Sequence, residues 1–223
     1  MKKLSLIIAA ALITCGAAFA KPSLSQEVQL HTGIGFNSAT YTTDTNQKIE
    51  VGSTAFVIGA EAWFLYDINK QFNFGFMSGF DAAIGGTSTY KLNGNKVDFG
   101  NKASAYHFNF IIGPAATFKL NNVVHFNGMF GFSWMIDDSY WTKNNVTDFG
   151  LHFSGCGIAF DLQAKFLPTK QFSPLAGYRL TINWADRVTT ESKSGSQINK
   201  ISDKQKNVCT SAGVIYLGCA YNF

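Results

Sequence analysis

The feature that most constrains this chain is a strict two-residue alternation that puts rings on one side and small or polar residues on the other. It is clearest between residues 72 and 84, where one parity holds Phe72, Phe74, Phe76, Phe80 and Ile84. The intervening positions include Asn73, Gly75, Gly79 and Asp81. Successive side chains of a β-strand point to opposite faces, so this pattern predicts a strand with one aromatic face and one small, polar face.

The same alternation recurs along most of the chain. It begins at Glu27 and returns in seven further stretches. Short turns near residues 68, 121 and 169 join six of the stretches in three pairs. The other connections are long and polar: 38–50, 87–103, 137–148 and 186–207. Eight strands in four hairpins, with short turns at one end and long loops at the other, predict an all-β, eight-stranded antiparallel up-and-down transmembrane β-barrel. A soluble carrier barrel, the fold-level alternative, would place its apolar residues inside.

Composition agrees with an apolar exterior. The 223 residues are 46% hydrophobic and 15% aromatic, and the charged fraction of 14% is below the usual quarter of soluble domains. The formal net charge is +4 and falls to +2 without Lys2 and Lys3, which is too small to indicate a nucleic-acid partner.

The first twenty residues have the features of a secretory signal peptide. Lys2 and Lys3 precede an apolar run that is too short to span a bilayer, and the stretch ends in Ala18, Phe19 and Ala20. We therefore expect residues 1–20 to be removed and residues 21–223 to form the barrel. A cut before Cys15, which loosely resembles a lipoprotein site, is the alternative.

The cysteines do not predict a disulfide framework or a metal site. Cys156, Cys209 and Cys219 remain after the leader, and they lack the C-x-x-C spacing of a metal site. We expect three free thiols, with no metal and no cofactor.

The final strand carries a more specific signal. Tyr221 and Phe223 resemble the terminal aromatic signal that the barrel-insertion machinery of the bacterial outer membrane reads. The whole predicted barrel, residues 21–223, resembles the small eight-stranded outer-membrane families: the OmpA membrane domain, OmpX, OmpW and the opacity-type adhesins. The resemblance is one of architecture and terminal signal; the chain lacks the peptidoglycan-binding domain of full OmpA and the N-terminal motif associated with OmpW. It implies a monomer in the cell outer membrane of a Gram-negative bacterium, in contact with membrane lipid and lipopolysaccharide.

An eight-stranded barrel is only wide enough inside for side chains, so inward charges need partners. Counting from the turns places Glu61, Asp161 and Arg179 at similar depth. A guanidinium can serve two carboxylates, so the sequence predicts an ion network centred on Arg179. It also predicts a second pair, Asp81 with His107, nearer the outer end. Such groups either plug the barrel or line a gated ion path, and filling by polar side chains is the normal state of small barrels.

One strand shows a change of parity. Phe149, Leu151 and Phe153 share one parity, whereas Ile158, Phe160 and Leu162 share the other. This predicts a β-bulge at Gly155, Cys156 and Gly157.

The sequence offers only weak candidates for a catalytic site. His152 and Ser154 form a possible base and nucleophile, and Asp137 with Asp138 resemble the paired aspartates of outer-membrane proteases, a family with ten strands. We therefore expect no enzyme; a lipid-modifying enzyme acting at the rim is the least favoured function.

The long loops suggest surface contacts. Two of them, 87–103 and 186–207, each carry a net charge of +2. We expect three aromatic residues at loop tips: Tyr90, Tyr140 and Trp141. We expect a structural or surface-adhesive role with a possible host or surface ligand. The alternative is a narrow OmpW-like channel for small hydrophobic molecules.

Overall fold

The computed structural model describes residues 24–97, 102–143, 147–194 and 197–223, all of which form strands and turns. The predicted signal peptide and its alternative cut at Cys15 lie outside these residues. No helix in the described part of the chain is long and apolar enough to cross a membrane, a finding that says nothing about a β-barrel. The strands are β1 (Leu24–Thr42), β2 (Lys48–Asp67), β3 (Phe72–Leu92), β4 (Asn95–Val97), β5 (Lys102–Lys119), β6 (Val124–Lys143), β7 (Thr147–Phe166), β8 (Phe172–Ser194) and β9 (Gln197–Asn222).

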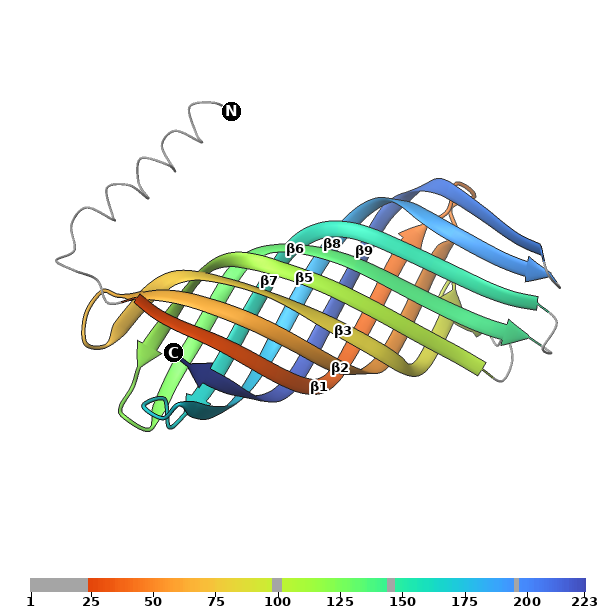
Figure 1. Ribbon diagram of the computed structural model, residues 1–223. Helices are drawn as coiled ribbons and strands as arrows, with labels where there is room; N and C mark the ends of the chain where they lie inside the picture. The colour runs from red at the N-terminus through yellow and green to blue at the C-terminus, as the bar shows by residue number, and fades with distance from the viewer. Residues whose placement is uncertain (1–23, 98–101, 144–146, 195–196) are drawn as a thin grey trace, which may run out of the picture.

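Eight of these strands form a closed antiparallel ring (Figure 1). Each pairs with its neighbour in sequence, with β4 set aside as a short hairpin partner of β3. The ring closes where β1 pairs with β9, from Glu27 opposite Asn222 to Thr42 opposite Lys206. The predicted eight-stranded up-and-down barrel is confirmed.

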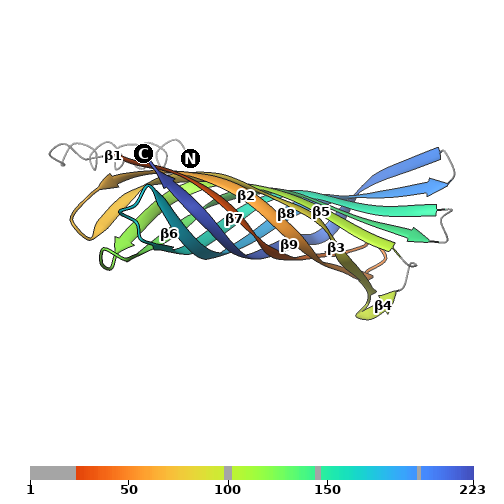
Figure 2. The same cartoon turned by 60° about the horizontal axis from the view of Figure 1, so that its bottom comes forward.

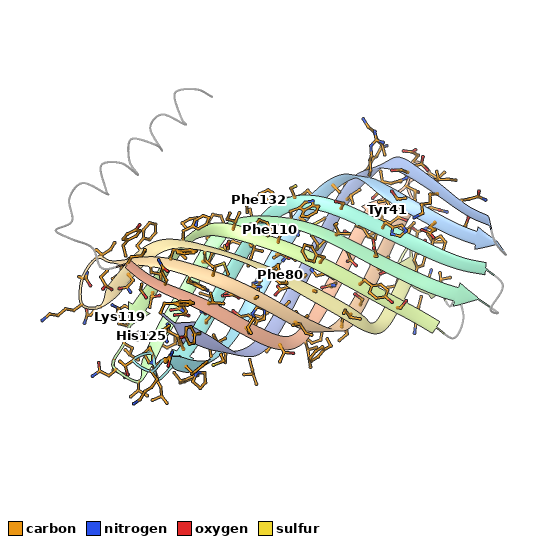
Figure 3. The ribbon with its side chains drawn as sticks, in the orientation of Figure 1. Tyr41, Phe80, Phe110, Lys119, His125 and Phe132 are labelled. Atoms are coloured by element: carbon orange, nitrogen blue, oxygen red, sulfur yellow. The ribbon has the colours of Figure 1, made fainter. Side chains whose placement is uncertain are left out.

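Large apolar side chains cover the outside of the ring. Phe130 and Leu217 are 52% and 66% exposed, whereas Trp63 and Arg179 are almost completely buried in the interior. Figure 3 labels three of the outward rings, Phe80, Phe110 and Phe132. A soluble core would reverse this arrangement, and the apolar belt is the surface that a lipid bilayer covers.

The four predicted loops are mostly strand. β1 continues to Thr42, β8 continues to Ser194, and the intervening hairpins turn within a few residues. Figure 2 shows the ends of β6, β7, β8 and β9 projecting together beyond the ring, with β4 standing apart from them. The polar residues of these stretches predict loops, but strands that extend beyond the membrane can be polar on both faces.

The ring is not closed over its whole length. Pairing between β3 and β5 stops at Ile84 opposite Tyr106, whereas β1 stays paired with β9 to its own end, at Thr42 opposite Lys206. The ring is therefore open at its outer end between β3 and β5, while β1, β2 and β3 remain joined to β9. The outer end of the interior holds an apolar group, which we call the outer cluster: Ala39, Tyr41, Ile49, Val51, Tyr90, Leu151, Phe153, Val188 and Val208.

The predicted bulge residues in β7 need a correction. A register shift does occur between Phe153 and Cys156. These two residues are three positions apart on β7, but their partners on β8, Val188 and Trp184, are four positions apart. The additional residue therefore lies on β8. Gly155, Cys156 and Gly157 continue β7 without a change of parity, and its pairing with β6 is unbroken. Leu151 and Phe153 are buried in the outer cluster, which explains why they share the parity of the inward polar residues.

Candidate functional site in the charged interior

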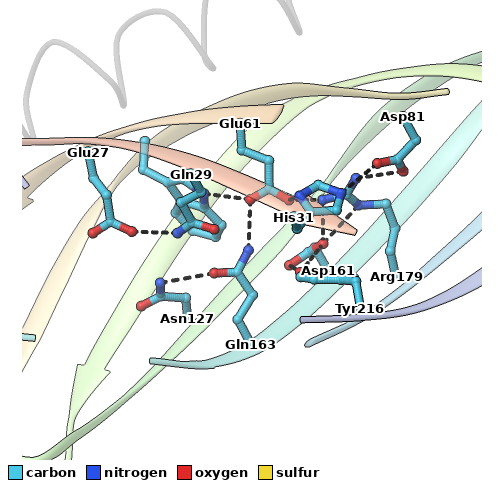
Figure 4. A network of polar contacts seen from close by, with 11 residues as sticks. Glu27, Gln29, His31, Glu61, Asp81, Asn127, Asp161, Gln163, Arg179 and Tyr216 are labelled. Carbon is cyan, nitrogen blue, oxygen red and sulfur yellow. Dashed lines mark hydrogen bonds and ion pairs between the residues drawn. The ribbon is translucent and has the colours of Figure 1, made fainter. Parts of the chain in front are cut away.

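Arg179 is the centre of the barrel interior (Figure 4). Its Nε donates to Asp161 Oδ2 at 2.8 Å and its Nη1 donates to Asp81 Oδ2 at 2.6 Å. Its Nη2 donates to Glu61 Oε1. The four side chains come from β2, β3, β7 and β8 and are each at most 3% exposed. One guanidinium therefore links strands on opposite sides of the ring, as its planar fork of donors allows.

His31 and Tyr216 complete this group. His31 Nε2 lies 2.7 Å from Asp81 Oδ1, and its Nδ1 lies 3.5 Å from Glu61 Oε1. Tyr216 donates its hydroxyl hydrogen to Asp161, with distances of 2.8 and 2.9 Å to the two carboxylate oxygens. The Tyr216 ring also packs against His31, with ring centroids 4.5 Å apart, and lies under Arg179. We call these six residues the Arg179 network: His31, Glu61, Asp81, Asp161, Arg179 and Tyr216.

A glycine makes room for part of this network. A Cβ at Gly59 would collide with His31 Nε2 and with Asp81 Oδ1. The absent side chain therefore lets the imidazole and the carboxylate meet across the strand.

Polar contacts continue toward the end of the barrel that holds the short turns. Glu61 Oε2 accepts hydrogen bonds from Trp63 Nε1 at 2.8 Å and from Gln163 Nε2 at 2.7 Å. Lys165 and Glu27 form a second buried ion pair. Figure 4 shows Gln163 bonded to Glu61 and to Asn127, and a separate hydrogen bond between Gln29 and Glu27. The described interior is therefore crossed by bonded side chains from β1, β2, β7 and β8, an arrangement that fills a lumen of this width.

The sequence-predicted residues are only partly brought together. Glu61, Asp161 and Arg179 meet directly, and Asp81 joins the same network. The predicted pair of Asp81 with His107 is wrong: Asp81 bonds to His31 and Arg179, while neither ring nitrogen of His107 has a hydrogen-bond partner in the described structure. His107 instead lies opposite Asp137 on β6. Counting from turns placed Asp81 too far outward, because strand tilt shifts the level of each successive strand.

Sequence reasoning missed His31 and Tyr216 as parts of the Arg179 network, and Gln163 as a donor to Glu61. A signal for His31 and Tyr216 was available. Both are inward positions of β1 and β9, and these two strands pair in the ring, with His31 opposite Gly218 and Gly33 opposite Tyr216.

A second polar group lies on the outer surface beyond the apolar belt. His152 Nδ1 is 2.9 Å from Asp138 Oδ1, and its Nε2 is 3.1 Å from Glu191 Oε2. The hydrogen bond to Asp138, followed by the bond to Glu191, raises the pKa of His152. A hydrogen bond from Lys200 lowers the pKa of Glu191. This outer salt-bridge group ties β6, β7, β8 and β9 together, and both nitrogens of His152 are occupied by carboxylates rather than turned to Ser154.

The predicted loop-tip aromatics do not lie at loop tips. Tyr90 is 8% exposed and belongs to the outer cluster. Thr54 and Phe56 are two residues apart on β2, but their partners on β3, Thr87 and Ile84, are three residues apart. The additional residue on β3, at Gly85 or Gly86, reverses which positions of β3 face inward, so Tyr90 faces the interior. Tyr140 and Trp141 lie within β6, and their side chains are outside the described ones.

The terminal aromatics lie on the exterior at the seam of the ring. The Tyr221 ring packs edge to face against Phe172 and Phe223, with centroid distances of 5.2 and 4.8 Å. The Phe223 amide donates to the Gln26 carbonyl at 3.1 Å.

Metal and disulfide chemistry find no site among the described side chains. Cys156, Cys209 and Cys219 are free. No group of three or more His, Cys, Asp or Glu residues in the described ranges is arranged to hold a metal ion.

Comparisons with known proteins identify the fold. No family model and no curated relative matches the sequence. A major outer membrane protein from Thermus thermophilus matches with a TM-score of 0.57 and 12% identity, covering 90% of this chain and all of that one. OprG, an outer membrane protein of Pseudomonas aeruginosa, matches with a TM-score of 0.50 and 13% identity over 89% of this chain and 96% of its own.

The outer membrane protease OmpT of Escherichia coli also has a TM-score of 0.50, at 9% identity, over 92% of this chain and 99% of that one. Together with the closed ring and the outward apolar belt, these likenesses give the chain the fold of the small outer-membrane β-barrel proteins, in its eight-stranded form.

Proposed function

We propose that this protein is an outer-membrane β-barrel with a structural or surface-adhesive role and no catalytic activity. The observation that carries the proposal is the Arg179 network, which fills the middle of the lumen with bonded, buried side chains. An open diffusion pore needs a water-filled lumen, and a filled one leaves the two ends of the barrel as the places where the protein can act.

The outer extensions supply the surface for such a role. The β8–β9 hairpin is the longest, and pairing within it runs from Ala185 opposite Val208 to Ser194 opposite Gln197. Its described basic side chains are Arg187, Lys200, Lys204 and Lys206; all are exposed, and Lys200 pairs with Glu191. Phosphate groups of lipopolysaccharide, or an anionic ligand on another surface, are the partners that such a hairpin suits.

Two measurements test the proposal. Fractionation with protease treatment of intact cells should recover the protein in the outer membrane and show cleavage in the β8–β9 hairpin but not in the short turns. Planar-bilayer recordings of the purified protein should show no steady conductance. Recovery of the protein in another compartment would overturn the proposed location. A stable open conductance would overturn the proposed closed lumen.

A second function, a narrow OmpW-like passage for small hydrophobic molecules, is favoured by one observation. The outer cluster is apolar and lies where pairing between β3 and β5 has ended, so an apolar interior adjoins an unpaired section of wall. An apolar fluorescent probe should then bind the wild type, and Phe153→Asp should abolish the binding while Phe160→Asp, on the exterior of the same strand, should not. Equal binding by both variants would exclude this route.

A further inference from the structure

Three cationic side chains of the β8–β9 hairpin form no ion pair with any of the described carboxylates. They are Arg187 on β8 and Lys204 and Lys206 on β9, and all three are exposed. Lys200, farther along the same hairpin, does form a pair, with Glu191 at 2.9 Å. We call Arg187, Lys204 and Lys206 the basic patch.

The strand register brings the basic patch together. Arg187 lies directly opposite Lys204, and Lys206 follows Lys204 by two positions on the same strand. The Cβ atoms of directly opposed residues in an antiparallel pair are about 5 Å apart, and residues two positions apart on a strand share a face. Like charges in such positions repel each other and lower the stability of the sheet. A bound anion removes this repulsion.

A local irregularity on β9 turns its part of the basic patch outward. Lys206 and Cys209 are three positions apart, but their partners on β1, Thr42 and Thr40, are two positions apart. The additional residue coincides with Asn207, whose φ of 53° lies in the left-handed region that some β-bulges require. Without this residue Lys206 would face the interior of the barrel.

β8 carries a matching irregularity, since its additional residue lies between Trp184 and Val188. Val188 is buried in the outer cluster, so the adjacent Arg187 faces outward. Asp203 lies opposite Val188 and is therefore on the other face of the hairpin. The side chain of Asp186 is outside the described ones; even with its carboxylate counted, the three cations of the basic patch leave an excess of positive charge.

The basic patch adjoins the apolar belt. Trp184 is the last aromatic residue of β8 and is 53% exposed on the exterior, and Arg187 follows it by three positions. Aromatic residues of membrane proteins collect where the hydrocarbon layer meets the lipid head groups. The patch therefore lies at the level of the head groups, between the belt and the part of the hairpin that projects in Figure 2.

We propose that the basic patch binds the phosphate groups of lipid A, the lipid portion of lipopolysaccharide. This inference rests on the proposed function, because it requires the barrel to stand in the outer membrane with the β8–β9 hairpin outside. The guanidinium of Arg187 offers parallel donors to phosphate oxygens, and the two ammonium groups add positive charge. A lipid fits better than a soluble anion, since its acyl chains can cover Trp184 and the belt while its phosphates reach the patch.

The test is thermal unfolding of the purified, folded protein in an uncharged detergent, read as the loss of the heat-modifiable gel form. Lipid A with both phosphates is compared with dephosphorylated lipid A and with inorganic phosphate at the same concentration. Phosphorylated lipid A should raise the unfolding temperature of the wild type by about 2–4 °C at saturation. The other two additions should leave it unchanged.

Two double variants with the same change of charge locate the effect. Lys204→Gln with Lys206→Gln should need about tenfold more lipid A for half of the full shift, because each cation near an anionic lipid surface contributes to binding. Lys70→Gln with Lys170→Gln, at exposed positions in the short turns at the opposite end of the barrel, should keep the wild-type value. Arg187→Gln should weaken the effect as well, and it serves if the first double variant does not fold.

The outcomes separate this inference from the proposed function. An equal shift with dephosphorylated lipid A, a shift produced by inorganic phosphate alone, or an unchanged requirement for lipid A in the patch variants would overturn lipid A phosphate binding. None of these results would alter the location of the protein, which the fractionation experiment measures independently.

Discussion

The middle and the outer end of the barrel interior are built from opposite chemistry. In the middle the ring of main-chain hydrogen bonds is complete, and the interior holds a guanidinium with three carboxylates. At the outer end the pairing between β3 and β5 has ended, and the interior holds the apolar outer cluster. Charged side chains can be accommodated where the wall is already fixed by its ladders of main-chain hydrogen bonds. Where one ladder stops, apolar packing inside the barrel must hold the open edges of the sheet in place.

Removing the central guanidinium should have the largest effect. Arg179→Met leaves Glu61, Asp81 and Asp161 buried without their shared cation and should cost about 3–5 kcal/mol of unfolding free energy. The measurement is the unfolding transition of the whole barrel in detergent with urea. Arg187→Met, at an exposed position, is the matched control and should change the free energy by less than about 0.5 kcal/mol. Similar transitions for both variants would show that the network does not hold the ring.

Truncation in the outer cluster should act locally. Phe153→Ala removes a buried ring that packs against Tyr41, with centroids 5.9 Å apart, and should cost about 3 kcal/mol at the outer end. Hydrogen exchange should rise in the strand extensions and stay unchanged in the belt. Phe160→Ala, on the exterior of β7, should leave exchange in the extensions as it is. Uniformly faster exchange would mean that the two regions unfold as one unit.

A side chain at Gly59 probes the fit within the network. Gly59→Ala should separate His31 from Asp81 and cost about 1–3 kcal/mol, because a methyl group cannot fit between them. Gly128→Ala is the control, since its Cβ would meet Leu162 at an ordinary 3.5 Å. The unfolding transition in urea measures both, and equal stability of the two variants would argue that His31 is not held by Asp81.

The smallest effect should come from the outer salt-bridge group. Because the pKa of His152 is raised in the folded protein, its ion pairs contribute fully to folding stability at pH values below the ordinary pKa of about 6.5. This contribution is lost as the pH rises through the raised pKa. The contribution should be below about 1 kcal/mol because the group is partly exposed. Protease cleavage of the β8–β9 hairpin should therefore accelerate above that pH. His152→Gln should remove this pH dependence, and a variant that kept it would point to another titrating group.

The belt of outward rings and the strand order could be predicted from sequence because alternation depends only on neighbouring residues. Phe74, Phe80 and Phe130 are read correctly from parity alone. Contact between Arg179 and Asp161 was equally accessible, since β7 and β8 are adjacent and these residues lie directly opposite each other.

The rest depends on quantities that parity does not contain. The partner of Asp81 depends on the stagger between successive strands along the barrel axis. This stagger determines whether Asp81 lies at the same height as Arg179 and His31. Tyr90 was placed outside because a single additional residue near Gly85 inverts the faces that follow it. Leu151 and Phe153 were read as a parity change because the outer interior was expected to be polar.

The seam between β1 and β9 has a consequence for how the protein is made. It joins the described strands that are farthest apart in sequence, so the ring cannot close until every strand between them is in position. Assembly should therefore be slow and cooperative. Until the last step, the incomplete sheet has two unpaired edge strands that can pair with non-native strands. Protection of these borders during biogenesis is as much a requirement of this architecture as the contacts of the finished barrel.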